Sequence, residues 1–175
     1  IAEVQTLLDT FGAALERGDI AAATACFQDD CYWRDLVTFT WNLHTCEGKD
    51  QIAAMLGAQL AATKPAGWKI AEGETASADG GVTTAWIEFE TAVARGYGLV
   101  RLKDGKIWTL LTTMAELKGH EEHKGFSRPL GAKHGADKHR PSWKEEREAE
   151  GDGRHGGIDV EQVVEGELLA LPLGE

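Results

Sequence analysis

The residue best suited to acid–base chemistry is Asp35, which lies in the run from Tyr32 to Leu36. The run has the composition of a β-strand, and strand alternation places Asp35 on the same face as Cys31 and Trp33. A carboxyl group beside a tryptophan on a strand face is a candidate for a buried acid with an altered proton affinity. Asp35 is therefore either a general base or a polar group that holds a pocket together by pairing with a backbone donor or an arginine.

Aromatic residues recur on the predicted strands. Five of the six tryptophans lie there, namely Trp33, Trp41, Trp68, Trp86 and Trp108. Alternation places Trp86 on one strand face with Thr84, Glu88 and Glu90. The pattern predicts a ligand pocket walled by aromatic side chains, although ordinary sheet packing would use the same residues. The predicted lining is Phe11, Trp33, Trp41, His44, Trp86, Trp108 and Met114.

Two motifs in the C-terminal third match the sequence patterns of cofactor or metal sites, but the flanking residues do not match the structures that such sites need. Residues 151–156 read Gly-x-Gly-x-x-Gly, but a dinucleotide site needs an apolar strand before this loop and a helix after it. A charged segment precedes it instead. His120 and His123 stand three residues apart in a polar segment, whereas a metal site needs three or four rigidly held ligands. The sequence therefore predicts no cofactor and no metal in this chain.

Composition and charge narrow the class of protein. A length of 175 residues with 42% hydrophobic residues supports one domain plus an appendage. The net charge of -11 argues against binding to nucleic acid or to an anionic membrane surface. No apolar run approaches the roughly 20 residues of a membrane span. The 3 cysteines show no Cys-x-x-Cys spacing, so we expect reduced thiols and a cytoplasmic protein.

Hydrophobic periodicity predicts an α+β domain over residues 1–118. Helical spacing appears over 1–17, 20–28 and from 48 to about 64, and β-like patterns appear over 31–36, 37–45, 68–74, 82–94, 97–103 and 106–117. The pair Asp104-Gly105 predicts a tight hairpin between the last two strands. This order favours one curved antiparallel sheet, with three helices from the N-terminal half on its concave side and a cavity between them. Residues 119–150 are predicted to be a connector, and 151–175 an acidic tail.

Several phrases of the sequence resemble a known superfamily. Residues 11–19, 26–30 and 33–35 are similar to the nuclear transport factor 2-like (SnoaL-like) superfamily. This cone-shaped α+β fold is shared by ketosteroid isomerases, polyketide cyclases, dehydratases and pure binding domains. A closer resemblance is to the N-terminal domain that is fused to flavin-dependent monooxygenases, and it rests on residues 32–36, 39–41, 108–114 and 116–119. Residues 128–131, 133–135 and 142–143 resemble the connector that leads into the flavin domain. The resemblance covers about residues 1–150.

The resemblance implies candidate catalytic residues. In ketosteroid isomerases a strand aspartate at the position of Asp35 is the general base, assisted by a tyrosine on the first helix and a protonated acid on a later strand. Phe11 stands at the helix position and has no hydroxyl, while Tyr97 falls at the later position. Loss of one oxyanion donor removes several kcal/mol of transition-state stabilisation. Asp35 and Tyr97 remain the candidates for catalysis. A dehydratase or cyclase could instead pair Asp35 with His44. Strand alternation, however, places His44 on the opposite face from the Trp41 ring.

Two functions follow from the resemblance. The first is a small-molecule-binding accessory or dimerisation domain of a flavin-dependent monooxygenase-like protein, which forms a homodimer and binds a small apolar or carbonyl compound. FAD and NADP would be needed only if a flavin domain follows. The alternative is a stand-alone acid–base enzyme of the isomerase, dehydratase or cyclase type that uses Asp35.

Overall fold

The computed structural model describes residues 2–128 and 141–152. The chain divides into two compact units, Ile1–Pro129 and Leu130–Glu175. The described part of the first unit contains three α-helices, a short 3-10 helix (Gly125–Ser127) and a seven-stranded sheet. From residue 153 onward, the predicted acidic tail lies outside the described residues, as does most of the glycine motif.

The three helices form where the apolar spacing predicts them. They are α1 (Ala2–Glu16), α2 (Ile20–Ala25) and α3 (Gly48–Thr63). Gly18 adopts a φ of 70° between the first two helices, a conformation that glycine takes without steric cost. The Asp19 side chain then accepts a hydrogen bond from the backbone N–H of Ala22 and caps α2.

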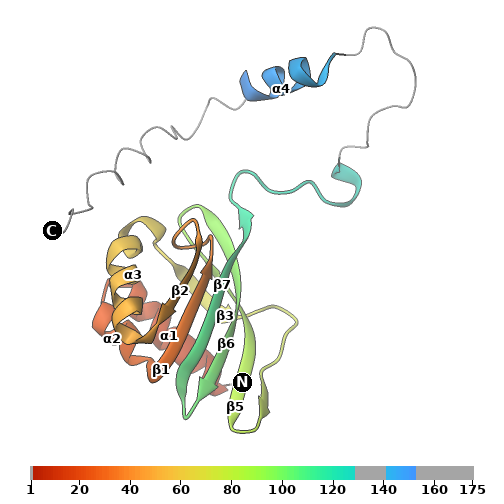
Figure 1. Cartoon of the computed structure of the whole chain (residues 1–175). Coiled ribbons are helices and arrows are strands. Elements are labelled where there is room, and N and C mark those ends of the chain that lie inside the picture. The colour runs from red at the N-terminus through yellow and green to blue at the C-terminus, as the bar shows by residue number, and fades with distance from the viewer. Residues whose placement is uncertain (1, 129–140, 153–175) are drawn as a thin grey trace, which may run out of the picture. The chain divides into compact units, whose positions relative to one another are not determined.

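The sheet is curved and open, and the helices pack against one of its faces (Figure 1). Its strands are β1 (Phe27–Leu36), β2 (Leu43–Glu47), β3 (Ala66–Ile70), β4 (Ser77–Asp79), β5 (Val82–Glu90), β6 (Ala94–Lys103) and β7 (Lys106–Leu117). The order is β2-β1-β7-β6-β5-β3, with β4 paired to β5. The face under the helices is called the inner face below, and the opposite face is called the outer face.

The α+β class is confirmed, and one strand pair corrects the expected antiparallel arrangement. β1 runs parallel to β7, whereas the other pairs in the described sheet are antiparallel. A parallel pair needs a long connection, and here α3 and the intervening strands separate β1 from β7 in the chain. The hairpin prediction is confirmed: Asp104 and Gly105 have φ values of 49° and 72°, as a type I′ turn requires.

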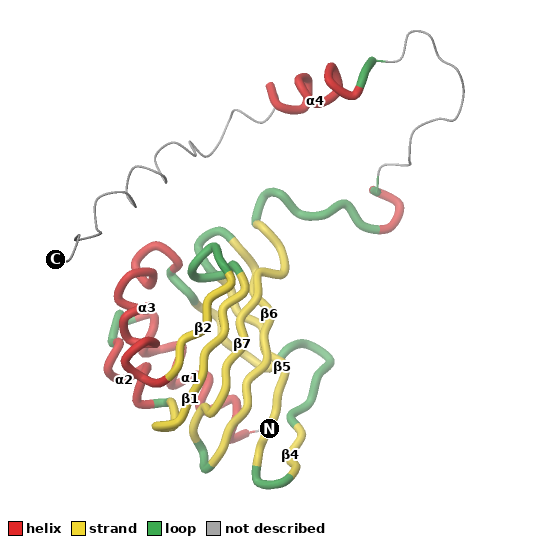
Figure 2. Tube along the Cα trace, in the orientation of Figure 1, coloured by secondary structure: helices red, strands yellow, loops and turns green. Residues whose placement is uncertain are grey.

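A second correction concerns the segment after β1. Residues 37–45 were expected to form one strand, but residues 37–42 form a loop of bends and β2 begins at Leu43 (Figure 2). Two non-glycine residues in this loop, Val37 and Trp41, have φ values of 59° and 54°. A strand cannot accommodate positive φ at these positions, so the chain turns back before β2 starts.

The free edge of β3 is covered by a helix residue. The Gln5 side chain on α1 donates from Nε2 to the carbonyl oxygen of Trp68 at 3.3 Å. Its Oε1 accepts a hydrogen bond from the backbone N–H of Ile70 at 3.2 Å. One amide side chain thus pairs with two backbone groups of the edge strand, and this contact holds α1 against the sheet.

Aromatic rings fill the space between the helices and the sheet. Phe11 of α1 lies edge-on to Phe27 and to Trp68, at centroid distances of 5.6 and 5.1 Å. Trp68 in turn stacks on Phe89 at 4.2 Å. The rings of this aromatic cluster are all buried, and its members are Phe11, Phe27, Trp33, Phe39, Trp68 and Phe89. These rings pack against one another between α1 and the sheet.

In the second unit, the described residues form α4 (Trp143–Asp152). Ser142 and Glu145 exchange hydrogen bonds at its start, the Glu145 side chain accepting from the Ser142 backbone N–H at 2.7 Å. This capping box explains where the charged helix begins. Accepting this hydrogen bond lowers the pKa of Glu145 from its ordinary value.

Candidate functional site

Asp35 is fully buried on the inner face, and both of its carboxyl oxygens are occupied. Oδ2 accepts from the backbone N–H groups of Phe39 and Thr40 and from the Thr40 hydroxyl, each at 2.9 Å. Oδ1 accepts from the hydroxyl of Thr112 at 2.8 Å. A general base must reach the proton that it removes from a substrate, and these oxygens are instead directed at the protein's own donors.

These hydrogen bonds fix the loop that follows β1. A β-branched residue at positive φ, such as Val37, is strained, and such strain persists only where the surroundings over-determine the conformation. Asp35 supplies that constraint by binding two successive backbone N–H groups of the loop. The loop presents Trp41 to solvent, with 60% of its surface exposed.

A polar chain of three residues crosses the inner face. The Trp33 indole Nε1–H donates to the Thr112 hydroxyl at 2.9 Å, and that hydroxyl donates onward to Asp35. All three residues are buried at 0% exposure. Each buried polar atom of this chain has a partner, which is the condition under which such groups stabilise a core.

Tyr97 lies on the opposite face of the sheet from Asp35. In β6–β7 it is paired with Thr113, the neighbour of Thr112, and neighbouring strand residues point to opposite faces. The Tyr97 ring stacks on Trp86 at a centroid distance of 5.3 Å and an interplanar angle of 15°. The structure therefore does not bring Asp35 and Tyr97 together into one catalytic pair.

The other predicted pocket residues are also divided. Phe11 and Trp33 meet in the aromatic cluster, with centroids 5.9 Å apart. His44 is paired with Asp35 across β1–β2, but it is exposed at the sheet edge. The remaining members are distributed over the loop and the strands, with Trp41 exposed, Trp86 40% exposed and Trp108 and Met114 partly buried.

The outer face carries an apolar band across its central strands. Leu111 is paired with Leu99, and Leu99 is paired with Trp86. Tyr97 lies in the next row, where its ring covers part of Trp86. These side chains are partly exposed because no helix of the first unit packs against them.

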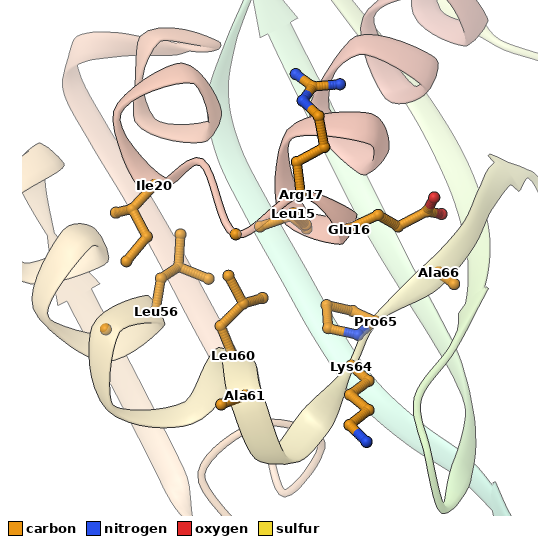
Figure 3. A pocket seen from close by; sticks show the side chains of 12 residues that line it. Leu15, Glu16, Arg17, Ile20, Leu56, Leu60, Ala61, Lys64, Pro65 and Ala66 are labelled. Carbon is orange, nitrogen blue, oxygen red and sulfur yellow. The ribbon is translucent and has the colours of Figure 1, made fainter.

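An open depression lies between the helices. It has a volume of about 710 Å³ and is lined by the end of α1, the start of α2, the second half of α3 and the segment entering β3. Figure 3 shows the apolar side chains that gather in it, with the two cationic residues Arg17 and Lys64 pointing away from each other at opposite sides. This site is called the helix groove below. Its apolar lining includes Leu15, Ile20, Leu56, Leu60 and Pro65.

The three cysteines are free and buried. Burial raises the pKa of the Cys26, Cys31 and Cys46 thiols above their ordinary value. For Cys46, the nearby Asp35 carboxyl raises the pKa further. Because the thiolate is the reactive form, none of these cysteines is set up as a nucleophile. Among the described residues, no three acidic, histidine or cysteine side chains are placed to hold a metal ion, and no helix is long and apolar enough to cross a membrane.

Sequence reasoning missed the partners of Asp35 and the helix groove. Thr112 lies 77 residues from Asp35, and only the parallel pairing of β1 with β7 brings them together. The groove had one signal in the sequence, Gly57 in the middle of a helical pattern, because an interior helix glycine has a packing or functional reason.

Two comparisons with known proteins agree on the fold. The model of the SnoaL-like domain family matches residues 8–110. None of the curated proteins compared with the chain matches it. A ketosteroid isomerase-like protein from Erwinia carotovora atroseptica is 15% identical, with a TM-score of 0.51 over 63% of this chain and 92% of that one. An Asp-to-Asn variant of Rv3472 from Mycobacterium tuberculosis, of unknown function, is 14% identical, with a TM-score of 0.52 over 67% and 72%.

The two solved structures are similar to this chain in fold, while the low identities carry no information about chemistry. The family match spans from α1 into β7 and covers more than half of the chain. The chain belongs to the SnoaL-like domain family.

Proposed function

We propose that this chain is a non-catalytic SnoaL-like domain that binds a small apolar or carbonyl compound and serves as an accessory domain. The observation that carries the proposal is Asp35, whose two oxygens accept four hydrogen bonds from within the protein. A carboxyl group committed in this way positions a loop. The separation of Tyr97 on the outer face supports the same conclusion, because it keeps the predicted hydroxyl donor away from Asp35.

Ligand binding combined with a proton-exchange assay tests this proposal against the enzyme alternative. Steroid, terpenoid and aromatic ketones are titrated while intrinsic tryptophan fluorescence is followed, and each binder is then tested for hydrogen–deuterium exchange or dehydration. We expect binding without turnover, both in the wild type and in Asp35→Asn. Turnover that Asp35→Asn abolishes, in a variant shown to be folded by circular dichroism, would establish the acid–base enzyme instead.

A second candidate function, homodimer formation, is favoured by the outer face. The Trp86–Tyr97 stack and the row from Trp86 through Leu99 to Leu111 form an apolar surface of the kind that protein interfaces use. In sedimentation equilibrium we expect a dimer that Trp86→Lys dissociates. Trp41→Lys is the control, because Trp41 is also an exposed tryptophan but lies on the loop after β1. A wild type that stays monomeric at all concentrations would exclude the dimer.

The accessory role proposed here is service to a flavin-dependent monooxygenase. Its support is the resemblance of residues 32–36, 39–41 and 108–114 to the domain fused to those enzymes. FAD and NADP would then be bound by a separate flavin domain. Sequencing the gene beyond codon 175 tests the idea: an in-frame flavin domain is expected, and any other downstream sequence would contradict the fused arrangement.

A further inference from the structure

Gly57 leaves an unfilled space on α3. It lies in the interior of a 16-residue helix, where glycine costs about 1 kcal/mol relative to alanine. A Cβ atom built on Gly57 would meet only the Ile20 Cδ1, at 3.9 Å, which is an ordinary contact. Packing therefore does not require glycine here. What glycine does provide is depth in the helix groove directly above it.

The walls of the groove are apolar and come from rigid elements. Leu56 and Leu60 are four residues apart on α3, so they form one row along the helix. Ile20 of α2 and Leu15 of α1 face them across the groove (Figure 3). The volume of about 710 Å³ falls within the range of roughly 300–1,000 Å³ that is usual for small-molecule sites.

The rim of the groove is locally cationic in a chain of net charge -11. Arg17 and Lys64 line it together with a single acid, Glu16. Other lysines pair with carboxylates at 2.6–2.8 Å, as Lys49 and Lys118 do. Within residues 2–128 and 141–152, the side chains of Arg17 and Lys64 have no such partner. Lys64 follows the last residue of α3 with a φ of 46°, and its side chain lies on the rim of the groove opposite to Arg17 (Figure 3).

We propose that the helix groove binds an amphiphile with a linear apolar body and one carboxylate, of the medium-chain fatty acid class. The apolar body lies over Gly57, along the partly exposed Leu60 and Ile20, and the carboxylate pairs with the Lys64 ammonium group. Apolar burial provides most of the affinity, and the charge pair fixes the orientation. This inference rests on the proposed binding role, for which it names the site and the ligand class.

Titration with decanoate tests the proposal, followed by calorimetry and by amide NMR shifts. We expect binding to the wild type with shifts centred on α3 and the start of α2. Gly57→Leu fills the groove, and leucine is a better helix former than glycine, so this variant stays folded. It should weaken decanoate binding at least about tenfold, which corresponds to about 1.4 kcal/mol. Ala58→Leu is the matched control, because Ala58 is exposed on the same helix and is not part of the lining.

The head group is tested separately. Lys64→Gln should weaken decanoate about threefold or more and leave decanol unchanged, because a charge-assisted pair is lost only with the carboxylate. Lys103→Gln, at the end of β6 and outside the groove, should change neither. Decanoate that binds Gly57→Leu as tightly as the wild type, or decanol that binds the wild type as tightly as decanoate, would overturn the inference.

Failure of the inference can be distinguished from failure of the proposed function. No tryptophan lines the groove, so a ketone that quenches tryptophan fluorescence equally in the wild type and in Gly57→Leu occupies another site. That result keeps the proposed binding role, and the groove is rejected as well if decanoate binds Gly57→Leu as tightly as the wild type. A protein that binds neither decanoate nor any compound of the fluorescence screen contradicts both.

Discussion

The inner and outer faces of the sheet carry similar aromatic residues in opposite settings. On the inner face, Trp33 is buried among other rings and its indole N–H is hydrogen-bonded to Thr112. On the outer face, Trp86 is 40% exposed and contacts the ring of Tyr97. The inner ring is thus part of the core beside the Asp35 carboxyl group, whereas the rings of Trp86 and Tyr97 remain partly open to solvent. Four measurements can break or sharpen this comparison.

The largest effect is expected for the inner tryptophan. Trp33→Ala should lower the free energy of unfolding by about 3–5 kcal/mol, because it opens a cavity and removes the donor to Thr112. Trp86→Ala is the matched outer-face variant and should cost about 1 kcal/mol, the value of an exposed aromatic pair. Urea unfolding followed by circular dichroism measures both. Equal losses would show that the two faces are buried alike.

The next effect concerns the carboxyl group itself. Asp35→Asn keeps the shape of the side chain but replaces one acceptor oxygen with an NH2 donor. That donor then faces either the Thr112 hydroxyl or the N–H groups of the loop. We expect a loss of about 2–3 kcal/mol, the range for hydrogen bonds to charged groups. Amide hydrogen exchange at Phe39 and Thr40 should also accelerate. Unchanged protection there would mean that Asp35 does not hold the loop.

A smaller effect is expected where two inner-face elements touch. A Cβ atom on Gly96 would lie 2.3 Å from Cζ of the Phe89 ring, and that ring is stacked on Trp68. Gly96→Ala should therefore cost about 1–2 kcal/mol through overpacking. The double variant with Phe89→Leu should recover part of this loss, because the two positions are coupled. Strictly additive losses would place the strain elsewhere.

The smallest effect belongs to an exposed ion pair. The hydrogen bond and charge of Lys118 lower the pKa of Glu90 from its ordinary value of 4.5. Glu90 thus contributes stability above pH 4.5, and the contribution is lost as pH falls through the lower folded-state pKa. Lys118→Gln should lower the melting temperature slightly at pH 7, and part of that difference should vanish near pH 3. In a Glu90→Gln background, the effect of Lys118→Gln should no longer depend on pH across this range.

Local rules accounted for much of the inner face. Alternation along β1 correctly grouped Cys31, Trp33 and Asp35, because a strand that is covered on one face fixes its own pattern. The same rule placed Trp86 with Glu88 and Glu90, and that shared face is the outer one. The sequence analysis nevertheless grouped Trp86 with Trp33 in one pocket. The two glutamates on the face of Trp86 favour a solvent-exposed face instead, because acidic residues are mostly exposed.

Long-range pairing could not be read from the sequence. The partner Thr112 depends on β7 lying beside β1, and no local pattern specifies that neighbour. The segment from Val37 to Asn42 has the composition of a strand, yet the Asp35 side chain binds two of its N–H groups and prevents regular pairing. These local hydrogen bonds from backbone to side chain override β propensity there.

The amide of Gln5 has a consequence for how this protein would aggregate. By pairing with Trp68 and Ile70, it occupies backbone groups that would otherwise accept another chain's strand. Detachment of α1 alone would uncover that edge while the rest of the sheet stays folded. Aggregation under mild stress would then follow the local opening of one helix rather than global unfolding, and Gln5→Leu would seed it at temperatures well below the main melting transition.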